Sequence, residues 1–203
     1  MSLPSAASIL VVAATERELA SGPWRTLCCG VGPVAAAVAT AAEIERERPA
    51  AILHVGICGV RRDSGLALGS IVIGTRSLYC DAGLAPKWVA NAVETPPLMT
   101  DAALRALPDA SFEAIGTTAI VGGSSRINNG VDVEAMEGFG VLFAAGMTQI
   151  PAIEVRAISN HIDETDRALW RFDDAFKAIT DATPALVLAI RQAIWLLASE
   201  SER

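Results

Sequence analysis

The sequence predicts an α/β fold with three layers, in which helices cover both faces of a central sheet. Short runs rich in β-branched residues alternate with longer segments of helical periodicity, which is the pattern of such domains. Most of the short runs are continuously apolar, as expected of strands that are covered on both faces. With 203 residues, of which 52% are hydrophobic, the chain suits one large domain, residues 1–203, rather than two small ones.

The expected elements follow from this alternation. Strands are expected at residues 8–14, 25–30, 51–57, 70–75, 113–121 and 152–159. Helices are expected at residues 33–48, 134–147 and 184–199, with Pro33 and Pro184 in the first turn, where a missing N–H costs least. The proline-rich segment 81–109 is expected to be irregular and to form loops over the sheet edge.

Composition and charge exclude several classes of partner. The net charge is -7, the pI is near 4.8, and no basic cluster exceeds the pair Arg61 and Arg62, so nucleic-acid binding is not expected. The apolar run 9–14 is too short to span a membrane. The cysteines lie in or beside apolar runs without metal-ligand spacing: Cys28, Cys29, Cys58 and Cys80. We expect a soluble, cytoplasmic protein with reduced core cysteines and with no membrane partner, metal or organic cofactor.

The first candidate for chemistry is Glu18, which follows the first expected strand. Thr15 and Glu18 fit the S/T-x-x-E capping box, so one interpretation is that Glu18 satisfies a backbone N–H at a helix start. The other is that Glu18 projects from the sheet edge as a general base, with its pKa raised by partial desolvation. The residues alone leave both interpretations open.

A glycine-rich turn follows the second expected strand. Residues 30–35, Gly-Val-Gly-Pro-Val-Ala, match the G-x-G-x-x-A pattern of dinucleotide-binding turns. That fold also needs an acidic residue near the end of the next strand, and residues 51–59 contain none. We therefore interpret the glycines as a tight turn before a helix and reject a nicotinamide cofactor.

The second candidate region combines Glu137 with the strand that ends at Asn160. Such a strand end delivers polar groups to the edge of the sheet, where open α/β sheets bind ligands. Glu137 could accept from both hydroxyls of a ribose, pair with Arg156, or sit as a first-turn carboxylate in a helix. Asn160 could end its strand or offer its amide to the edge of a purine.

Six segments then occur in a characteristic order: Glu18, residues 30–36 (GVGPVAA), 54–59 (HVGICG), 68–72 (LGSIV), 133–137 (VEAME) and 155–160 (VRAISN). Together they resemble the purine nucleoside phosphorylase and nucleosidase superfamily over residues 8–198. Residues 159–170 (SNHIDETDRALW) are similar to the futalosine hydrolases, which carry a comparable Ser-Asn, Arg and Trp arrangement. The resemblance implies a nucleoside phosphorylase-like three-layer α/β/α sandwich with a twisted mixed sheet.

The superfamily contains phosphorylases and hydrolases, and the residues of this chain favour hydrolysis. A hexameric-type phosphorylase would place an Arg and a Ser where His54 and Ile57 stand. Ile57 cannot donate a hydrogen bond, and His54 is mostly neutral at pH 7 unless a carboxylate holds it charged. In related hydrolases a carboxylate at the position of Glu18 activates water. The resemblance implies the same role for Glu18, and it implies that Glu137 holds the ribose hydroxyls and that Met136 packs under the sugar.

The expected base specificity depends on Asn160. Adenosine-cleaving relatives carry Asp at this position, whereas the amide of Asn160 can donate to a 6-oxo group or N7. A buried mismatch costs about 1–3 kcal/mol. We expect hydrolysis of a 6-oxopurine nucleoside, futalosine, to hypoxanthine and dehypoxanthine futalosine in menaquinone biosynthesis. The alternatives are a methylthioadenosine/S-adenosylhomocysteine or aminodeoxyfutalosine nucleosidase, and a nucleoside-binding relative without activity.

Two further features bear on the pocket and its assembly. Where relatives place an aromatic ring that stacks on the base, this chain has Arg126 and Ile127. Arg126 could lie over the purine, reach the carboxylate of futalosine, or be a surface residue. Related nucleosidases build part of the pocket across a subunit interface, which implies a homo-oligomer. The apolar C-terminal helix with Trp195 and Leu196 is one candidate interface, although core burial explains it equally well.

Overall fold

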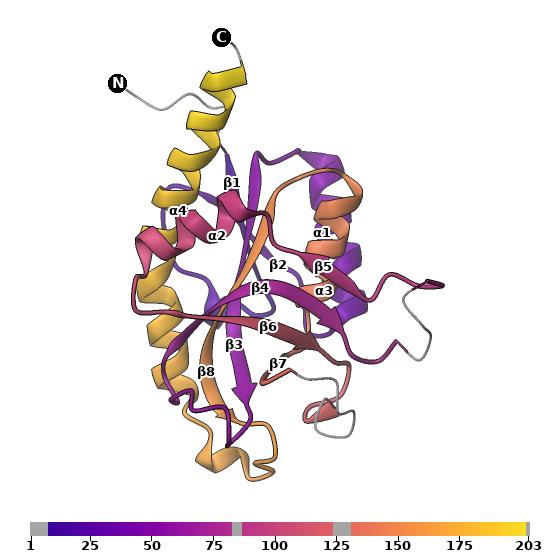
Figure 1. The fold of residues 1–203 in the computed structure, drawn as a ribbon, viewed down its shortest axis with the longest axis vertical. Helices are drawn as coiled ribbons and strands as arrows, with labels where there is room; N and C mark the ends of the chain where they lie inside the picture. Colours follow the sequence, from indigo (N-terminus) through magenta and orange to yellow (C-terminus); the bar gives the residue numbers. More distant parts are fainter. Residues whose placement is uncertain (1–7, 83–86, 124–130, 202–203) are drawn as a thin grey trace.

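The computed structural model describes residues 8–82, 87–123 and 131–201, and its centre is one mixed sheet (Figure 1). The strands are β1 (Ile9–Ala13), β2 (Arg25–Cys28), β3 (Ala51–Val60), β4 (Ile71–Tyr79), β5 (Ala92–Glu94), β6 (Ser111–Thr117), β7 (Val133–Ala135) and β8 (Ala152–His161). Their order is β2-β1-β3-β7-β6-β4-β5, and β8 lies off this path, paired with β3 and β4.

Strand β8 is the connecting strand of the sheet. It runs parallel to β3 along almost its whole length and antiparallel to the start of β4. Because β4 pairs with β6, β6 with β7, and β7 with β3, these strands close into a ring. Nearly every residue of β8 is buried, as expected of a strand with neighbours on both edges.

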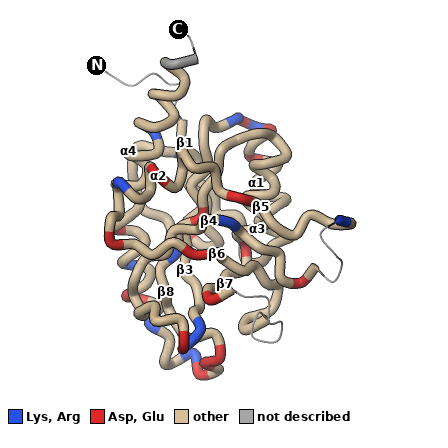
Figure 2. Tube along the Cα trace, in the orientation of Figure 1, with Lys and Arg blue, Asp and Glu red and all other residues tan. Residues whose placement is uncertain are grey.

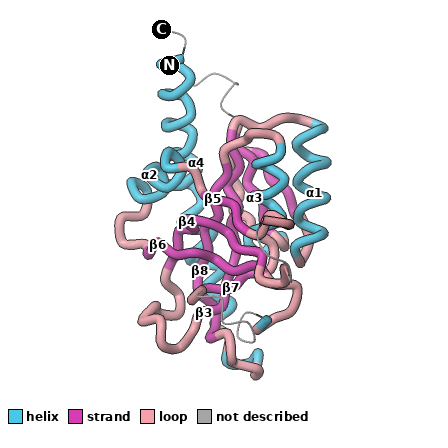
Figure 3. The backbone as a smooth tube through the Cα atoms, turned by 45° about the vertical axis from the view of Figure 1, so that its right-hand side comes forward, coloured by secondary structure: helices cyan, strands magenta, loops and turns pink. Residues whose placement is uncertain are grey.

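Helices cover both faces of the sheet (Figures 1 and 3). One face carries α1 (Pro33–Arg46) and α3 (Gly138–Met147), and the other carries α2 (Pro97–Ala106) and α4 (Phe172–Ser201). Two short 3-10 turns, η2 (Glu16–Glu18) and η4 (Arg167–Leu169), follow β1 and β8. The large apolar clusters lie between the helices and the sheet. The predicted α/β class with three layers is confirmed.

The glycine-rich turn starts α1 as expected. Gly30 and Gly32 have φ values of 80° and 97°, which favour glycine, and Pro33 occupies the first turn. Close packing of α1 on α3 depends on a third glycine, because a Cβ at Gly140 would lie 2.3 Å from the carbonyl oxygen of Pro33. This packing brings the turn at Gly32 beside the start of α3.

Three expectations about elements were wrong. The helix expected at 134–147 begins only at Gly138, because residues 133–135 pair with β3 and β6 as β7. The helix expected at 184–199 begins at Phe172, and Pro184 lies inside it. The segment 81–109, expected to be irregular, contains β5 and α2.

Helix α4 has the length and apolar character of a membrane span, with a mean hydropathy of 1.4 over its most apolar stretch. One side of it packs on the sheet, where Ala175, Ile179, Leu186 and Ile190 are buried. Core packing therefore accounts for the apolar residues on this side of the helix. Its C-terminal end rises beyond the sheet in Figure 1.

The cysteines are free thiols, and three of them are buried. Burial raises the pKa of Cys29 and of Cys58 to about 12, so both are protonated at neutral pH. Cys28 is exposed, which corrects the expectation that all four lie in the core. It ends an outer strand, β2, whose side chains alternate between half-buried and exposed.

Candidate active site

A pocket of about 380 Å³ opens at the carboxyl ends of β1, β3 and β8. Its lining includes Glu18, Ile57, Met136, Glu137 and Asn160, which the sequence predicted as site residues from four separate segments. The remaining predicted residues, 126 and 127 (Arg126 and Ile127), lie outside the described residues. The catalytic and binding roles of all of them stay predictions.

Glu18 makes the expected cap contacts and also lines the pocket. Its Oε2 accepts hydrogen bonds from the backbone N–H and the hydroxyl of Thr15, each at 2.8 Å, as in a capping box. Its Oε1 accepts from the backbone N–H of Ile57 at 3.2 Å, which ties η2 to β3. The side chain is buried yet lines the pocket, so the cap fixes the carboxylate at the cavity wall.

Glu137 is held from two sides at the N-cap of α3. Its Oε1 accepts from the backbone N–H of Gly32 at 3.1 Å, and its Oε2 lies 3.3 Å from Nη2 of Arg156. The ion pair with Arg156 was one of the alternatives left open by the sequence. It does not exclude ligand binding, because Glu137 also lines the pocket.

Arg156 lies behind this wall, fully buried, in a cluster of ionisable side chains. Its Nε donates to Glu154 at 2.8 Å, and its Nη2 lies 2.5 Å from Nε2 of His54. Burial opposes the charge of the guanidinium, but Glu154, Glu137 and Glu18 outweigh it and raise the pKa of Arg156. Burial, reinforced by Arg156, lowers the pKa of His54 well below its usual range, which confirms the expectation that this histidine is neutral.

The amide of Asn160 has a defined orientation. Its Nδ2 donates to the carbonyl oxygen of His161 at 2.9 Å, and a carbonyl can only accept, so the nitrogen must lie on that side. The hydroxyl of Ser159 lies 2.7 Å from Oδ1 and 3.0 Å from the carbonyl oxygen of Cys58. Within the described part of the chain, the second N–H of Asn160 makes no hydrogen bond and can donate to a ligand in the pocket.

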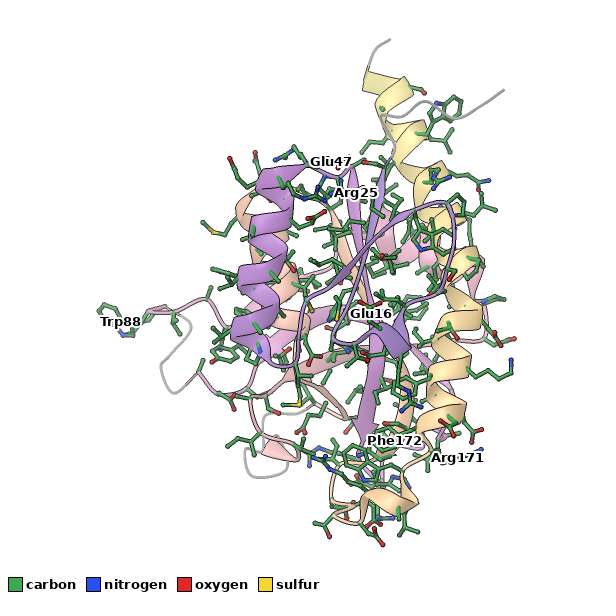
Figure 4. All side chains as sticks on the ribbon, turned by 180° about the vertical axis from the view of Figure 1, so that it is seen from behind. Glu16, Arg25, Glu47, Trp88, Arg171 and Phe172 are labelled. Carbon is green, nitrogen blue, oxygen red and sulfur yellow. The ribbon has the colours of Figure 1, made fainter. Side chains whose placement is uncertain are left out.

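An aromatic wall that the sequence analysis did not assign completes the pocket. Trp170, Phe172 and Phe176 line it, with ring centroids 5.3 Å apart for Trp170–Phe172 and 6.0 Å for Phe172–Phe176. Figure 4 shows Phe172 at the start of α4, at the end of the molecule opposite Arg25 and Glu47. A signal in the sequence is the spacing of Phe172 and Phe176, one helical turn apart in the segment that follows the Ser-Asn strand end.

The charges of the described part of the chain give the pocket an acidic rather than a basic character. Glu18, Glu134 and Glu137 line it, and Arg167 on η4 is the basic residue of the described lining. Over the whole described chain, basic and acidic residues are interspersed (Figure 2). No group of three metal-ligating side chains comes together among the described residues.

Comparison with known proteins identifies the family. A profile of the phosphorylase superfamily matches residues 14–191. The chain belongs to this superfamily. A futalosine hydrolase of Streptomyces coelicolor is 31% identical over 191 residues, covering 80% of this chain and 78% of the relative. The resemblance inferred from the motif order is thereby confirmed.

Solved structures of superfamily members share the fold. A futalosine hydrolase of Helicobacter pylori superposes with a TM-score of 0.78 at 14% identity, covering 89% of this chain and 97% of that one. A 5′-methylthioadenosine/S-adenosylhomocysteine nucleosidase of Colwellia psychrerythraea, in complex with adenine, gives a TM-score of 0.76 at 19% identity over 92% and 95% of the two chains. The nucleoside phosphorylase-like fold is therefore confirmed.

Proposed function

We propose that this protein is a purine nucleosidase that hydrolyses the N-glycosidic bond of futalosine and releases hypoxanthine. Family membership and the Streptomyces coelicolor relative support the coarser activity, hydrolysis of a purine nucleoside. The finer assignment, to futalosine, rests on that relative and on the base end of the pocket, by which we mean the lining at Asn160.

The observation that carries the choice of base is the fixed amide of Asn160. Its nitrogen faces the carbonyl oxygen of His161, so the amide keeps one N–H to donate. A purine with a 6-oxo group accepts at O6 and N7, whereas the 6-amino group of adenine is itself a donor. The N–H of Asn160 can therefore donate to either atom of hypoxanthine but only to N7 of adenine, and a donor left facing the 6-amino group would cost about 1–3 kcal/mol.

In the proposed mechanism, Glu18 takes a proton from the attacking water as the water oxygen bonds to C1′ of the ribose. The bond from C1′ to N9 of the purine breaks, and its electron pair leaves with the base, where the N–H of Asn160 stabilises the negative charge. Glu137 accepts from the ribose hydroxyls and stabilises the positive charge of the oxocarbenium-like transition state. Met136 packs under the sugar, and Ile57 lies beside it.

Water is the proposed nucleophile because the pocket favours cations over anions. Three carboxylates and one Arg belong to its described lining. Phosphate would meet Glu18 and Ile57, and the Ile57 side chain offers no donor. The same features disfavour a phosphorylase, the other reaction class of the superfamily.

Two alternatives follow from other observations. The fold similarity to nucleosidases solved with adenine or methylthio-immucillin favours an adenine nucleosidase, against which the amide of Asn160 argues. A nucleoside-binding relative without activity would keep the pocket but lack turnover. If futalosine is the substrate, we place the protein in menaquinone biosynthesis, in the cytoplasm, as a homo-oligomer without nucleic-acid or membrane partners.

The experiment is a hydrolysis panel in which the released base is identified by chromatography. The substrates are futalosine, aminodeoxyfutalosine, methylthioadenosine, inosine and adenosine, each with and without inorganic phosphate. Release of hypoxanthine from futalosine at a rate independent of phosphate is the expected result. Release of adenine alone would establish the adenine nucleosidase, and no release from any substrate would establish the binding-only alternative.

A further inference from the structure

The buried cluster behind the pocket contains two ionisable residues that the proposed mechanism does not use. His54 and Glu154 are almost completely inaccessible and do not belong to the pocket lining. They cannot touch a substrate in the pocket, yet both contact Arg156. Arg156 in turn contacts Glu137, which does line the pocket.

The guanidinium of Arg156 is oriented by contacts along every edge. Nε donates to Oε1 of Glu154 at 2.8 Å, Nη1 donates to the carbonyl oxygen of Ile57 at 3.4 Å, and Nη2 faces His54. Because the group is planar and rigid, these contacts on different edges define its plane and its rotation. Nη2 also donates to Oε2 of Glu137, which lies 3.3 Å away.

His54 accepts from Arg156 because its tautomer is fixed. Nδ1 lies 3.0 Å from the carbonyl oxygen of Val12, which can only accept, so Nδ1 carries the proton. Nε2 is then an acceptor and faces Nη2 of Arg156 at 2.5 Å. A neutral histidine thus anchors a cation, which is consistent with the lowered pKa of His54.

The backbone makes room for this cluster at two glycines. A Cβ on Gly56 would lie 2.2 Å from Nη1 of Arg156 and 2.9 Å from Oε1 of Glu18, so both atoms lie over this glycine. A Cβ on Gly138, at the start of α3, would lie 1.9 Å from Oε2 of Glu154. Apolar side chains would fill the same volume at lower desolvation cost. Stability therefore does not explain why these residues are ionisable, whereas the need to hold Glu137 in the pocket wall does.

We propose that Glu154 and His54 are positioning residues, which orient Arg156 so that it holds Glu137 at its place in the pocket wall. The proposal rests on the proposed function, since it assigns Glu137 to the ribose. It predicts that loss of either contact to Arg156 impairs the chemical step more than substrate binding. A displacement of a catalytic group by about 1 Å can cost on the order of 100-fold in rate.

The test uses two matched pairs of variants in the full-length protein. Glu154→Gln keeps an oxygen that accepts from Nε of Arg156, and Glu154→Met removes it at similar volume. His54→Gln can place an oxygen near the position of Nε2, and His54→Leu cannot. Met99→Ala, which opens a cavity in the core at the start of α2, serves as a control for lost stability, because Met99 is buried and does not line the pocket.

For each variant, kcat, KM and Tm are measured with the best nucleoside of the panel, together with Kd for a cationic iminoribitol and for inosine. Glu154→Met and His54→Leu should lower kcat by about 10- to 100-fold with KM within about 3-fold, and the Gln variants should recover most of the rate. The same two variants should lose the preference for the cationic ligand over inosine, because Glu137 is displaced. Met99→Ala should lower Tm without changing kcat or that preference.

Two results would overturn the positioning role. One is an equal loss of kcat in the Gln and apolar variants; the other is a loss that scales with Tm across all variants, including Met99→Ala. A wild-type protein without turnover would overturn the proposed function alone, and the iminoribitol preference would then decide the positioning role. A wild-type protein that does not prefer the cationic ligand would also overturn the positioning role.

Discussion

Asn160 determines which polar atoms the base end of the pocket offers to a purine. Replacing its amide by a carboxyl, Asn160→Asp, puts an oxygen where Nδ2 now donates to the carbonyl oxygen of His161. The carboxyl must then be protonated or turn away, and when ionised it accepts from a 6-amino group rather than donating to a 6-oxo group. We expect the ratio of kcat/KM for futalosine to that for aminodeoxyfutalosine to fall by about 10- to 100-fold.

The measurement is a competition assay in which one enzyme sample receives both nucleosides and the two bases are quantified. Asn160→Ala is the matched control, since it removes the donor without adding an acceptor and should lower both rates. Unchanged selectivity in Asn160→Asp would show that the amide does not read the base.

Glu18 is the proposed general base, and its amide variant tests this role. In Glu18→Gln the side-chain oxygen can still accept from Thr15 or from the N–H of Ile57, so the turn η2 keeps part of its support. The amide cannot accept a proton from water, so kcat should fall by about 100- to 10,000-fold. KM and Tm should change little, which steady-state kinetics and thermal unfolding would check. A variant that retains more than a tenth of the rate would remove Glu18 as the base.

The sequence predicted pocket-lining residues where a motif and an expected strand end coincide, as at Glu18 and Asn160, whereas Glu137 came from the motif alone. It did not assign Phe172 or Phe176, because aromatic residues at helical spacing are more often core than site, and only the docking of α4 turns these rings to the pocket. The contact of His54 with Arg156 is equally invisible in sequence, since the two residues are 102 positions apart.

At the scale of elements, α1 is tied to β2 by a charge cluster. Glu43 of α1 pairs with Arg46 and with Arg25 of β2. The hydrogen bond from Arg46, with that from Arg25, lowers the pKa of Glu43 from 4.5 to about 2. A carboxyl with a depressed folded-state pKa stabilises the protein above its unfolded pKa and loses this contribution as pH falls.

The contribution of Glu43 should therefore be complete above about pH 5 and should disappear between about pH 4.5 and 2. Because the group is partly solvated, Glu43→Gln should cost no more than about 1 kcal/mol at pH 7. Urea unfolding of both proteins at pH 7, 4 and 2.5 measures the difference, which should shrink as pH falls. The exposed Glu45→Gln on the same helix is the control. A difference that is constant with pH would contradict the assigned pKa.

Three elements were mispredicted because the local sequence signal was either misleading or too short to show a period. Pro184 indicates a helix start, yet α4 continues through it, and directly before it Thr183 donates its hydroxyl to the carbonyl oxygen of Ile179. Strand β7 has three residues, too few for a period to show, and is defined by its partners β3 and β6. The prolines at 96 and 97 indicate a loop, whereas they cap and begin α2.

At the scale of the molecule, the alternation of strands and helices was enough to predict the fold class but not which strands pair with one another. Strand β8 lies between β3 and β4 although almost a hundred positions separate it from β3. Such contacts depend on long-range packing, which no local period encodes. The pocket also depends on long-range packing, because it forms only where the ends of β1, β3 and β8 meet.

The assembly expected from the resemblance has two candidate surfaces. On α4, Leu196 is 53% exposed. On α1, Val34 and Val38 are 73% and 65% exposed and lie one turn apart on the same side of the helix. Val31, just before α1, is exposed and also lines the pocket. Since an interface that completes the pocket must border it, the α1 surface is the better candidate.

Lysine substitutions distinguish the two surfaces. Val34→Lys with Val38→Lys would bury two charges in an interface at α1, and should convert the protein to a smaller species with reduced turnover. Leu196→Lys should leave both size and rate unchanged. Light scattering coupled to size-exclusion chromatography gives the mass, and the rate is followed on dilution of each protein. Dissociation by Leu196→Lys alone would move the interface to α4, and a monomeric, fully active wild type would reject both surfaces because the pocket would then be complete within one chain.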